Sequence, residues 1–211
     1  MKYKHVIWDF DGTLFDTYPA MAAAFSAVLR EYGIAEPANT IQSLMKVSAG
    51  YAKQYYKKLY SLEDSFFDRY KTVKRSHEID RAKPFDGVAE ICRRICGHGG
   101  SNYLFTHRGE SAQYFIDRFG LAQYFIELVT SKYNFERKPS PEGILYLAAK
   151  YGFQRDKALM VGDRDLDILS AKSAGISGCY ITDGKVPLEA ADICVDRPAD
   201  LFRVLGLGPV Q

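Results

Sequence analysis

The chain has 211 residues, of which 47% are apolar, so it can bury one core domain and still carry a smaller insertion. Its net charge of +2 is spread along the sequence without a basic block, which argues against nucleic acid as the main partner. No apolar run approaches the ~20 residues of a membrane span and the first residues do not resemble a signal peptide, so we expect a cytoplasmic protein without membrane attachment, as a monomer or weak dimer.

The first predicted element is a buried strand at His5–Trp8, which is short and rich in β-branched and aromatic residues. Asp9 and Asp11 follow it. Because strand side chains alternate, residues two apart point the same way, roughly 6.5–7 Å apart, and both carboxylates can address one small substrate. Gly12 allows a sharp turn, after which the hydroxyl and amide of Thr13 could meet an anion. An ordinary Asp-rich turn also fits this stretch.

From residue 17 the apolar spacing becomes that of helices. Thr17 as N-cap and Pro19 in the first turn open a first helix, which Gly33 ends. Further helices are expected at residues 41–47, 51–60 and 63–76, each with an apolar stripe. The stripes include Tyr51, Tyr55 and Leu59, which we expect in the core, although a few tyrosines could instead face a ligand. Residues 17–83 therefore form a predicted all-helical unit.

After residues 84–87 (Pro-Phe-Asp-Gly), strand and helix signals alternate to the end of the chain. Strands are expected at residues 102–106, 126–130, 158–161, 179–182 and 193–195. Helices are expected at residues 88–96, 110–119, 141–151, 166–174 and 199–205. This alternation predicts an α/β fold, a Rossmann-like three-layer core with a parallel sheet. The core spans residues 1–16 and 84–211 and is interrupted by the helical insertion.

Polar residues at the ends of the core strands are the candidate site, because such sheets bind ligands beyond the carboxyl ends of their strands. Thr106 and His107 follow one strand, where a hydroxyl and backbone amides could hold phosphate oxygens. Asp163 and Asp167 follow another strand and could gather round one cation. Lys138 precedes a proline and a helix and could extend an ammonium into the same crevice. Each feature alone also has a plain structural explanation, such as acids at a helix N-terminus or a solvated lysine.

Taken in order, these motifs resemble the haloacid dehalogenase superfamily over nearly the whole chain. The motifs are DFDGTL at residues 9–14, Thr106, Lys138 in a K-P-x-P-E context, and G-D-x-x-x-D at residues 162–167. The helical insertion is similar to the cap of the phosphoglycolate phosphatase-like branch, which also contains β-phosphoglucomutase and phosphonoacetaldehyde hydrolase. The resemblance implies a phosphatase that acts on a small phosphorylated metabolite.

The resemblance also implies roles for individual residues. Asp9 would be the nucleophile and Asp11 the general acid/base, which must start protonated. Like charges and burial make that possible by raising a carboxyl pKa. A Mg²⁺ ion would be held by Asp9, the Asp11 carbonyl, Asp163 and, through water or by orienting the other ligands, Asp167. The substrate phosphate would be bound by Gly12, Thr13, Thr106, His107 and Lys138.

Other activities stay open at this point. A β-phosphoglucomutase-like phosphomutase uses the same core and differs in the cap. A phosphonate hydrolase needs a Schiff-base lysine, for which the insertion offers several lysines but marks none as buried. A metal-independent dehalogenase is disfavoured because Asp11 and two acids of the fourth motif are present, and a non-catalytic binding protein is disfavoured by the intact motifs. We expect a Mg²⁺-dependent phosphomonoester phosphatase that forms an aspartyl-phosphate, with residues 17–83 deciding the substrate.

Overall fold

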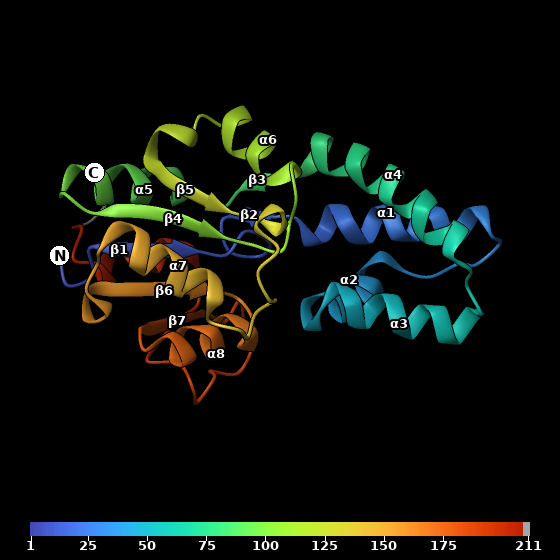
Figure 1. The fold of residues 1–211 in the computed structure, drawn as a ribbon. Coiled ribbons are helices and arrows are strands. Elements are labelled where there is room, and N and C mark those ends of the chain that lie inside the picture. The colour runs from blue at the N-terminus through green and yellow to red at the C-terminus, as the bar shows by residue number, and fades with distance from the viewer. Residues whose placement is uncertain (209–211) are drawn as a thin grey trace. The chain divides into compact units, whose positions relative to one another are not determined.

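The computed structural model describes residues 1–208, and the chain divides into two compact units. One unit, the core unit, comprises Met1–Leu14 and the chain from Pro84 onward, and the other, the helical unit, comprises Phe15–Lys83. The helical unit begins two residues earlier than the sequence indicates. The reason is that β2 (Phe15–Asp16) pairs with β3 (Lys83–Pro84) in a small two-stranded sheet at the two ends of the unit (Figure 1).

The core unit is built on a six-stranded sheet with the strand order β5-β4-β1-β6-β7-β8. All neighbouring strands in it are parallel. The strands are β1 (His5–Trp8), β4 (Ser101–Phe105), β5 (Phe125–Val129), β6 (Ala158–Gly162), β7 (Ser177–Ile181) and β8 (Ile193–Val195). The direction of winding reverses at β1, which lies between β4 and β6, and ligands bind at such a switch point. The predicted α/β, Rossmann-like fold is confirmed.

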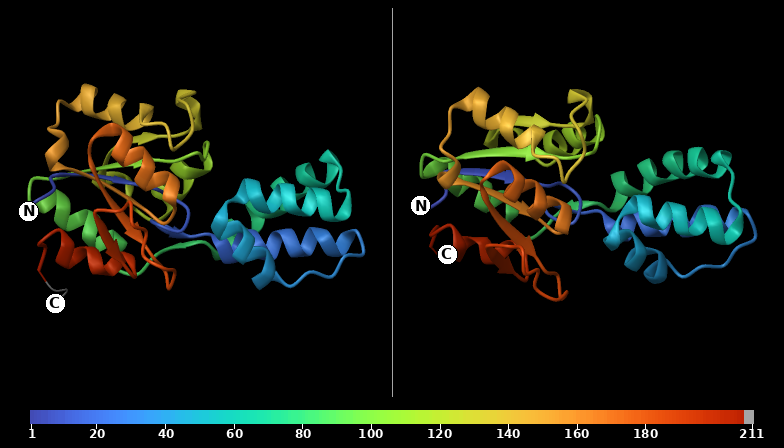
Figure 2. Two further views of the ribbon diagram at one scale, coloured as in Figure 1. Left: turned by 90° about the horizontal axis from the view of Figure 1, so that it is seen from below. Right: turned by 60° about the horizontal axis from the view of Figure 1, so that its bottom comes forward.

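Helices cover both faces of this sheet. They are α5 (Val88–Gly97), α6 (Ser111–Arg118), α7 (Glu142–Tyr151), α8 (Asp165–Ala174) and α9 (Leu201–Val204). Figure 2 shows α7 and α8 on one face and α5 with α9 on the other. Ile7 of β1 packs into the cluster under α7 and α8, whereas the indole of Trp8 donates to Asn102 at 2.9 Å, and Asn102 donates to the Cys92 carbonyl of α5 at 3.0 Å. β1 is therefore buried on both faces, which explains its unbroken apolar run.

The helical unit consists of α1 (Tyr18–Glu31), α2 (Ala38–Val47), α3 (Ala49–Tyr60) and α4 (Asp64–Arg81). Phe25 is central to its core, with the rings of Tyr56 and Phe66 at 5.2 and 5.1 Å. The expectation for α3 is wrong in one respect: Tyr51, Tyr55 and Leu59 lie on its exposed face, and Tyr56 with Ala52 is buried instead. α4 also continues past residue 76 to Arg81. None of the described helices is long and apolar enough to cross a membrane.

Candidate active site

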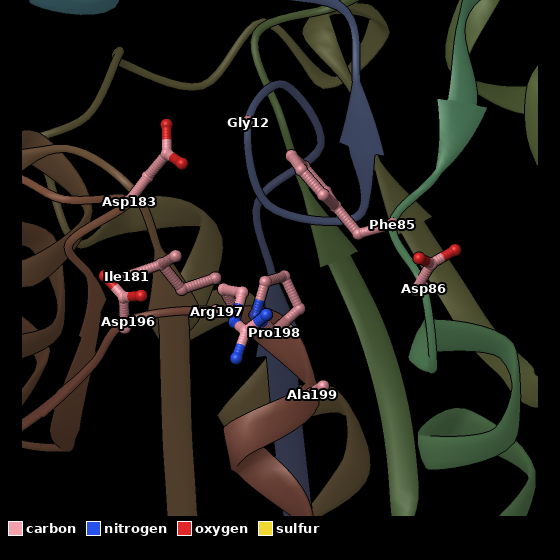
Figure 3. A pocket seen from close by; sticks show the side chains of 9 residues that line it. All are labelled: Gly12, Phe85, Asp86, Ile181, Asp183, Asp196, Arg197, Pro198 and Ala199. Carbon is pink, nitrogen blue, oxygen red and sulfur yellow. The ribbon is translucent and has the colours of Figure 1, made fainter.

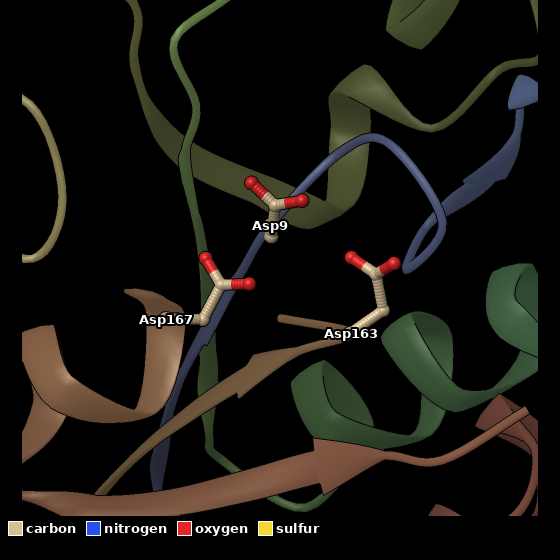
Figure 4. Close-up of side chains that lie close together, drawn as sticks. All are labelled: Asp9, Asp163 and Asp167. Carbon is tan, nitrogen blue, oxygen red and sulfur yellow. The ribbon is translucent and has the colours of Figure 1, made fainter. Parts of the chain in front are cut away.

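Three buried carboxylates meet at the carboxyl ends of β1 and β6. Asp9 directly follows β1, Asp163 directly follows β6, and Asp167 lies in the first turn of α8. Their side chains point toward one another (Figure 4), and one oxygen of each lies within 4.8 Å of the others. The topology therefore brings together three of the four acids to which the sequence assigns a metal.

The ammonium of Lys138 lies among these acids. Its Nζ donates to Oδ1 of Asp9 and to Oδ1 of Asp167, each at 2.5 Å, and to the Phe105 carbonyl at 3.1 Å. The Lys138 side chain is fully buried. Burial opposes its charge, but the attraction of Asp167 and Asp9 is larger in sum and raises the pKa of Lys138 above its usual value. Lys138 is therefore a fixed positive charge at Asp9, the carboxylate for which the family resemblance implies the role of nucleophile.

One lysine does not balance three carboxylates. Burial raises the pKa of Asp9 to about 6 in spite of Lys138, and burial with the charges of Asp9 and Asp167 raises the pKa of Asp163 to about 8. The second Asp9 oxygen, Oδ2, is buried and has no hydrogen-bond partner among the described residues. A divalent cation would relieve the repulsion and take up this oxygen. Hard oxygen donors of this kind fit Mg²⁺.

Asp167 uses both of its oxygens within the protein. Oδ1 accepts from Lys138, and Oδ2 accepts from the backbone N–H of Arg164 at 3.2 Å. Gly162 makes this close packing possible, because a Cβ at that position would lie 2.3 Å from Asp167 Cγ. The geometry therefore favours Asp167 as the residue that orients Lys138, in line with the indirect role that the sequence allowed for it.

Asp11 is not part of the cluster of three acids and pairs instead with Arg108, a residue for which the sequence analysis predicts no role. Arg108 Nε lies 2.9 Å from both Asp11 oxygens, and Nη2 donates to Oδ1 at 2.6 Å. The guanidinium also lies over the ring of Phe10, 4.8 Å from its centroid. Both Asp11 oxygens accept hydrogen bonds in this arrangement, so the acid role expected of Asp11 requires this pair to open. The metal role expected of its backbone carbonyl stays a prediction.

Thr106 and His107 follow β4 beside Lys138. Thr106 is buried, and its hydroxyl accepts the backbone N–H of Arg108 at 3.2 Å. Nε2 of His107 accepts the backbone N–H of Lys138 at 2.8 Å. Burial, followed by the charge of Lys138, lowers the pKa of His107 to about 4, so the ring is neutral near neutral pH. The ring nitrogen of His107 that faces Lys138 is thus already occupied.

The turn after Asp11 is partly as expected. Gly12 has φ 75°, the left-handed conformation that the sharp turn requires. Thr13 differs from expectation, because its N–H donates to the Phe10 carbonyl at 3.4 Å within the turn. Its hydroxyl is buried without a hydrogen-bond partner in the described structure. The Thr13 amide is therefore part of the turn and is not held open for an anion.

Lys185 is a second basic residue that sequence reasoning missed. Its Nζ donates to the Asp163 carbonyl at 2.6 Å and lies 3.9 Å from Asp163 Oδ2. Lys185 follows β7, whose carboxyl end lies at the same edge of the sheet as those of β1 and β6. The signal that could have found Lys185 is its position shortly after the end of a core strand, which it shares with Thr106 and Asp163.

A pocket of about 210 Å³ lies in the core unit beside the Gly12 turn. Figure 3 shows Phe85 and Asp86 on one side of it and Asp183 and Asp196 on the other. Its lining does not include the three clustered acids or Lys138. The pocket therefore borders the loop of Asp11, and the candidate chemistry lies outside it.

The chain is similar to several known proteins over most of its length. The family model described as haloacid dehalogenase-like hydrolase matches residues 6–181. A phosphoglycolate phosphatase from Aquifex aeolicus is 29% identical over 209 residues, covering 95% of each chain. An N-acetylmuramic acid 6-phosphate phosphatase from Pseudomonas aeruginosa is 28% identical over 222 residues, covering 97% of this chain and 96% of that one. The solved structure of a hydrolase from Streptococcus pneumoniae TIGR4 matches with a TM-score of 0.72 and 31% identity, covering 98% of this chain and 100% of that one.

Proposed function

The chain belongs to the haloacid dehalogenase-like hydrolase family, and we propose that it is a Mg²⁺-dependent phosphatase that hydrolyses a small phosphate monoester through an aspartyl-phosphate. The observation that carries this proposal is the buried cluster of Asp9, Asp163 and Asp167 around the ammonium of Lys138. Such a cluster is suited to a cation and a phosphoryl group together. The two phosphatases named above act, by their names, on phosphate monoesters.

In the proposed reaction the Asp9 carboxylate attacks phosphorus, and the bond between phosphorus and the ester oxygen breaks. Asp11, released from Arg108, gives a proton to the departing alkoxide. Water then attacks the phosphorus of the aspartyl-phosphate, Asp11 takes a proton from that water, and inorganic phosphate leaves with Asp9 restored. The two proton transfers balance, so Asp11 ends the cycle in its starting state.

The surrounding residues hold this reaction in place. Lys138 orients Asp9 through Oδ1 and neutralises charge on the transferred phosphoryl group. The Thr106 hydroxyl donates a hydrogen bond to one oxygen of that phosphoryl group. Asp9 and Asp163 would hold the Mg²⁺, while Asp167 keeps Lys138 in position. When bound, Mg²⁺ supplies further neutralisation of the acids and of the phosphoryl oxygens.

We also propose that the helical unit determines which alcohol part of the substrate is accepted. The described core residues to which we assign a role account for a phosphoryl group and its metal, and none of these residues is assigned to the rest of the molecule. A panel of 2-phosphoglycolate, N-acetylmuramic acid 6-phosphate, hexose phosphates and pyrophosphate would rank the candidates. A phosphomutase would convert a hexose phosphate into an isomer without releasing phosphate, so the same panel separates the two activities.

The test is hydrolysis of p-nitrophenyl phosphate. We expect activity that is lost with chelator, restored by Mg²⁺ and inhibited by Ca²⁺, whose larger and more flexible shell suits the site poorly. Asp9→Asn and Asp163→Asn should abolish it. Asp165→Asn is the matched control, because Asp165 is exposed at the start of α8, two residues after Asp163, and its oxygen accepts only a local N–H among the described contacts, that of Leu166 at 2.8 Å. Undiminished turnover in excess chelator, or an active Asp9→Asn variant, would contradict the proposal.

A further inference from the structure

Lys138 lies in a loop that has no helix or strand of its own to fix it. The loop runs from the short turn at Ser131–Tyr133 to α7, yet its lysine has to place a buried ammonium between two carboxylates. Side chains from other elements hold the loop instead. One of them, Ser170 of α8, donates its hydroxyl to the Ser140 carbonyl at 2.8 Å, two residues beyond the lysine. The backbone N–H of Lys138 is held by His107, which follows the end of β4.

Two neighbours of Thr106 hold the two ends of Lys138. The Phe105 carbonyl accepts from the ammonium at 3.1 Å, and Nε2 of His107 accepts from the backbone N–H at 2.8 Å. The segment 105–107 therefore contacts Lys138 both at its ammonium and at its backbone N–H, and Thr106 is the middle residue of that segment. The relative position of Thr106 and Lys138, two groups proposed to face the same phosphoryl group, is set by this segment.

The protonation state of the His107 ring fits a hydrogen bond to the Lys138 backbone. A ring nitrogen that accepts an N–H carries no proton, so Nε2 cannot at the same time donate to a phosphate oxygen. The ring also meets Phe105 edge to face, with the centroids 6.4 Å apart, which limits its rotation. The low pKa of His107 described above means that protonation does not interrupt the contact near neutral pH.

We propose that His107 is a positioning residue: by accepting the Lys138 N–H through Nε2 it aligns Lys138 with Thr106 for phosphoryl transfer, and this nitrogen does not bind the substrate. This inference rests on the proposed function and deepens it, because it replaces the substrate-binding role expected of His107 from the sequence. A misplacement of about 1 Å in a catalytic group can lower a rate by roughly a hundredfold, so the effect should be measurable.

The experiment compares His107→Gln with His107→Phe. The glutamine Oε1 can reach the place of Nε2 and accept the Lys138 N–H, whereas phenylalanine keeps the ring but offers no acceptor. We expect His107→Phe to lower kcat for p-nitrophenyl phosphate by roughly 10- to 100-fold. KM and the inhibition constant of inorganic phosphate should change by less than about threefold, and His107→Gln should keep kcat within about threefold of the wild type. His98→Phe, at an exposed histidine, is the matched control and should leave both constants unchanged.

A second variant removes the ammonium that His107 is proposed to position and keeps the backbone N–H that His107 contacts. In a Lys138→Met background the His107→Phe change should have no further effect on the residual rate, because no ammonium is left to be misplaced. An equal loss in both backgrounds would overturn the proposal. So would a normal kcat with a raised KM and a raised phosphate inhibition constant, which would show that the ring binds substrate, and so would a His107→Gln variant as impaired as His107→Phe.

A measurement without turnover separates this inference from the proposed function. The Lys138 amide, followed by NMR hydrogen exchange in the full chain, should lose protection in His107→Phe and keep it in His107→Gln. If the wild type hydrolyses no phosphate ester, the proposed function fails while this exchange experiment still decides the positioning contact. Unchanged protection of the amide in His107→Phe would overturn the inference on its own.

Discussion

Replacing Lys138 by methionine should destabilise the core unit, and the size of the loss follows from the burial of its ion pairs. The ammonium is fully buried and lies 2.5 Å from oxygens of Asp9 and Asp167. Removing one partner of a buried ion pair costs roughly 3–5 kcal/mol, because the remaining charge stays buried without compensation. Lys172 and Asp192 form a pair of the same length at the surface, with 44% and 37% of their side chains exposed. Lys172→Met should therefore cost no more than about 1 kcal/mol.

The loss of stability in Lys138→Met should grow as the pH rises. Burial raises the pKa of Asp9 to about 6, and Lys138 works against that shift, so the variant raises this pKa further. A carboxyl whose folded pKa lies above its unfolded value of 3.8 contributes stability below that value and loses it as the pH rises through the folded pKa. The difference between Lys138→Met and wild type should thus be smaller at about pH 4 than at about pH 7.5.

Urea unfolding followed by the fluorescence of Trp8 is a direct assay for this effect. Trp8 is the single tryptophan of the chain, is buried in β1, and so reports on the core unit. The free energy of unfolding should fall by the amount given above at neutral pH, and excess Mg²⁺ should recover part of it. A Lys138→Met variant within about 1 kcal/mol of wild type at neutral pH, or equally weakened at both pH values, would refute the reasoning.

Three further predictions concern the same site. Asp11→Asn should lower kcat by roughly 10²–10⁴-fold and leave Mg²⁺ affinity, measured by calorimetry, unchanged, because the Asp11 carboxylate is outside the acid cluster. Gly162→Ala should cost about 1–3 kcal/mol in urea unfolding, since its Cβ would meet Asp167, whereas Gly97→Ala, with nothing within 4 Å, should be neutral. Without metal, stability should decline as the pH rises from about 4 to 8, because the folded pKa values of Asp9 and Asp163 are raised to about 6 and about 8. The increase in Tm produced by Mg²⁺ should grow over the same range, and an increase independent of pH would contradict this.

Most of the fold could be predicted because its signals are local. β1 is a short apolar run, α8 ends at Gly175 in the left-handed conformation, and each core strand is bounded by turn residues. β2 and β3 could not be predicted, since two residues carry no periodicity and their pairing joins residues that are distant in sequence. The exposed face of α3 was misassigned because its tyrosines have the same spacing as core residues, and only packing separates the two cases.

The candidate site was predictable where a residue's place follows from the end of a strand. Asp9, Thr106 and Asp163 lie where parallel strands end at one edge of the sheet, so topology alone brings them together. The partners of Arg108 and Lys185 depend on where long, flexible side chains reach, and no spacing in the sequence encodes that direction. The same holds for His107, whose contact is with the main chain of a residue in another motif.

The position of β1 at the centre of the sheet has a consequence for how the chain folds during synthesis. β1 leaves the ribosome before its partners β4 and β6, which begin only at Ser101 and Ala158. At ordinary translation rates β1 waits roughly 5–20 s for its first neighbour. The helical unit, Phe15–Lys83, is continuous in sequence and can fold during that interval. Pairing of β2 with β3 then shortens the path between β1 and β4, so folding of the insertion lowers the loop-closure entropy that the central strand pairing must overcome, compared with an unfolded insertion.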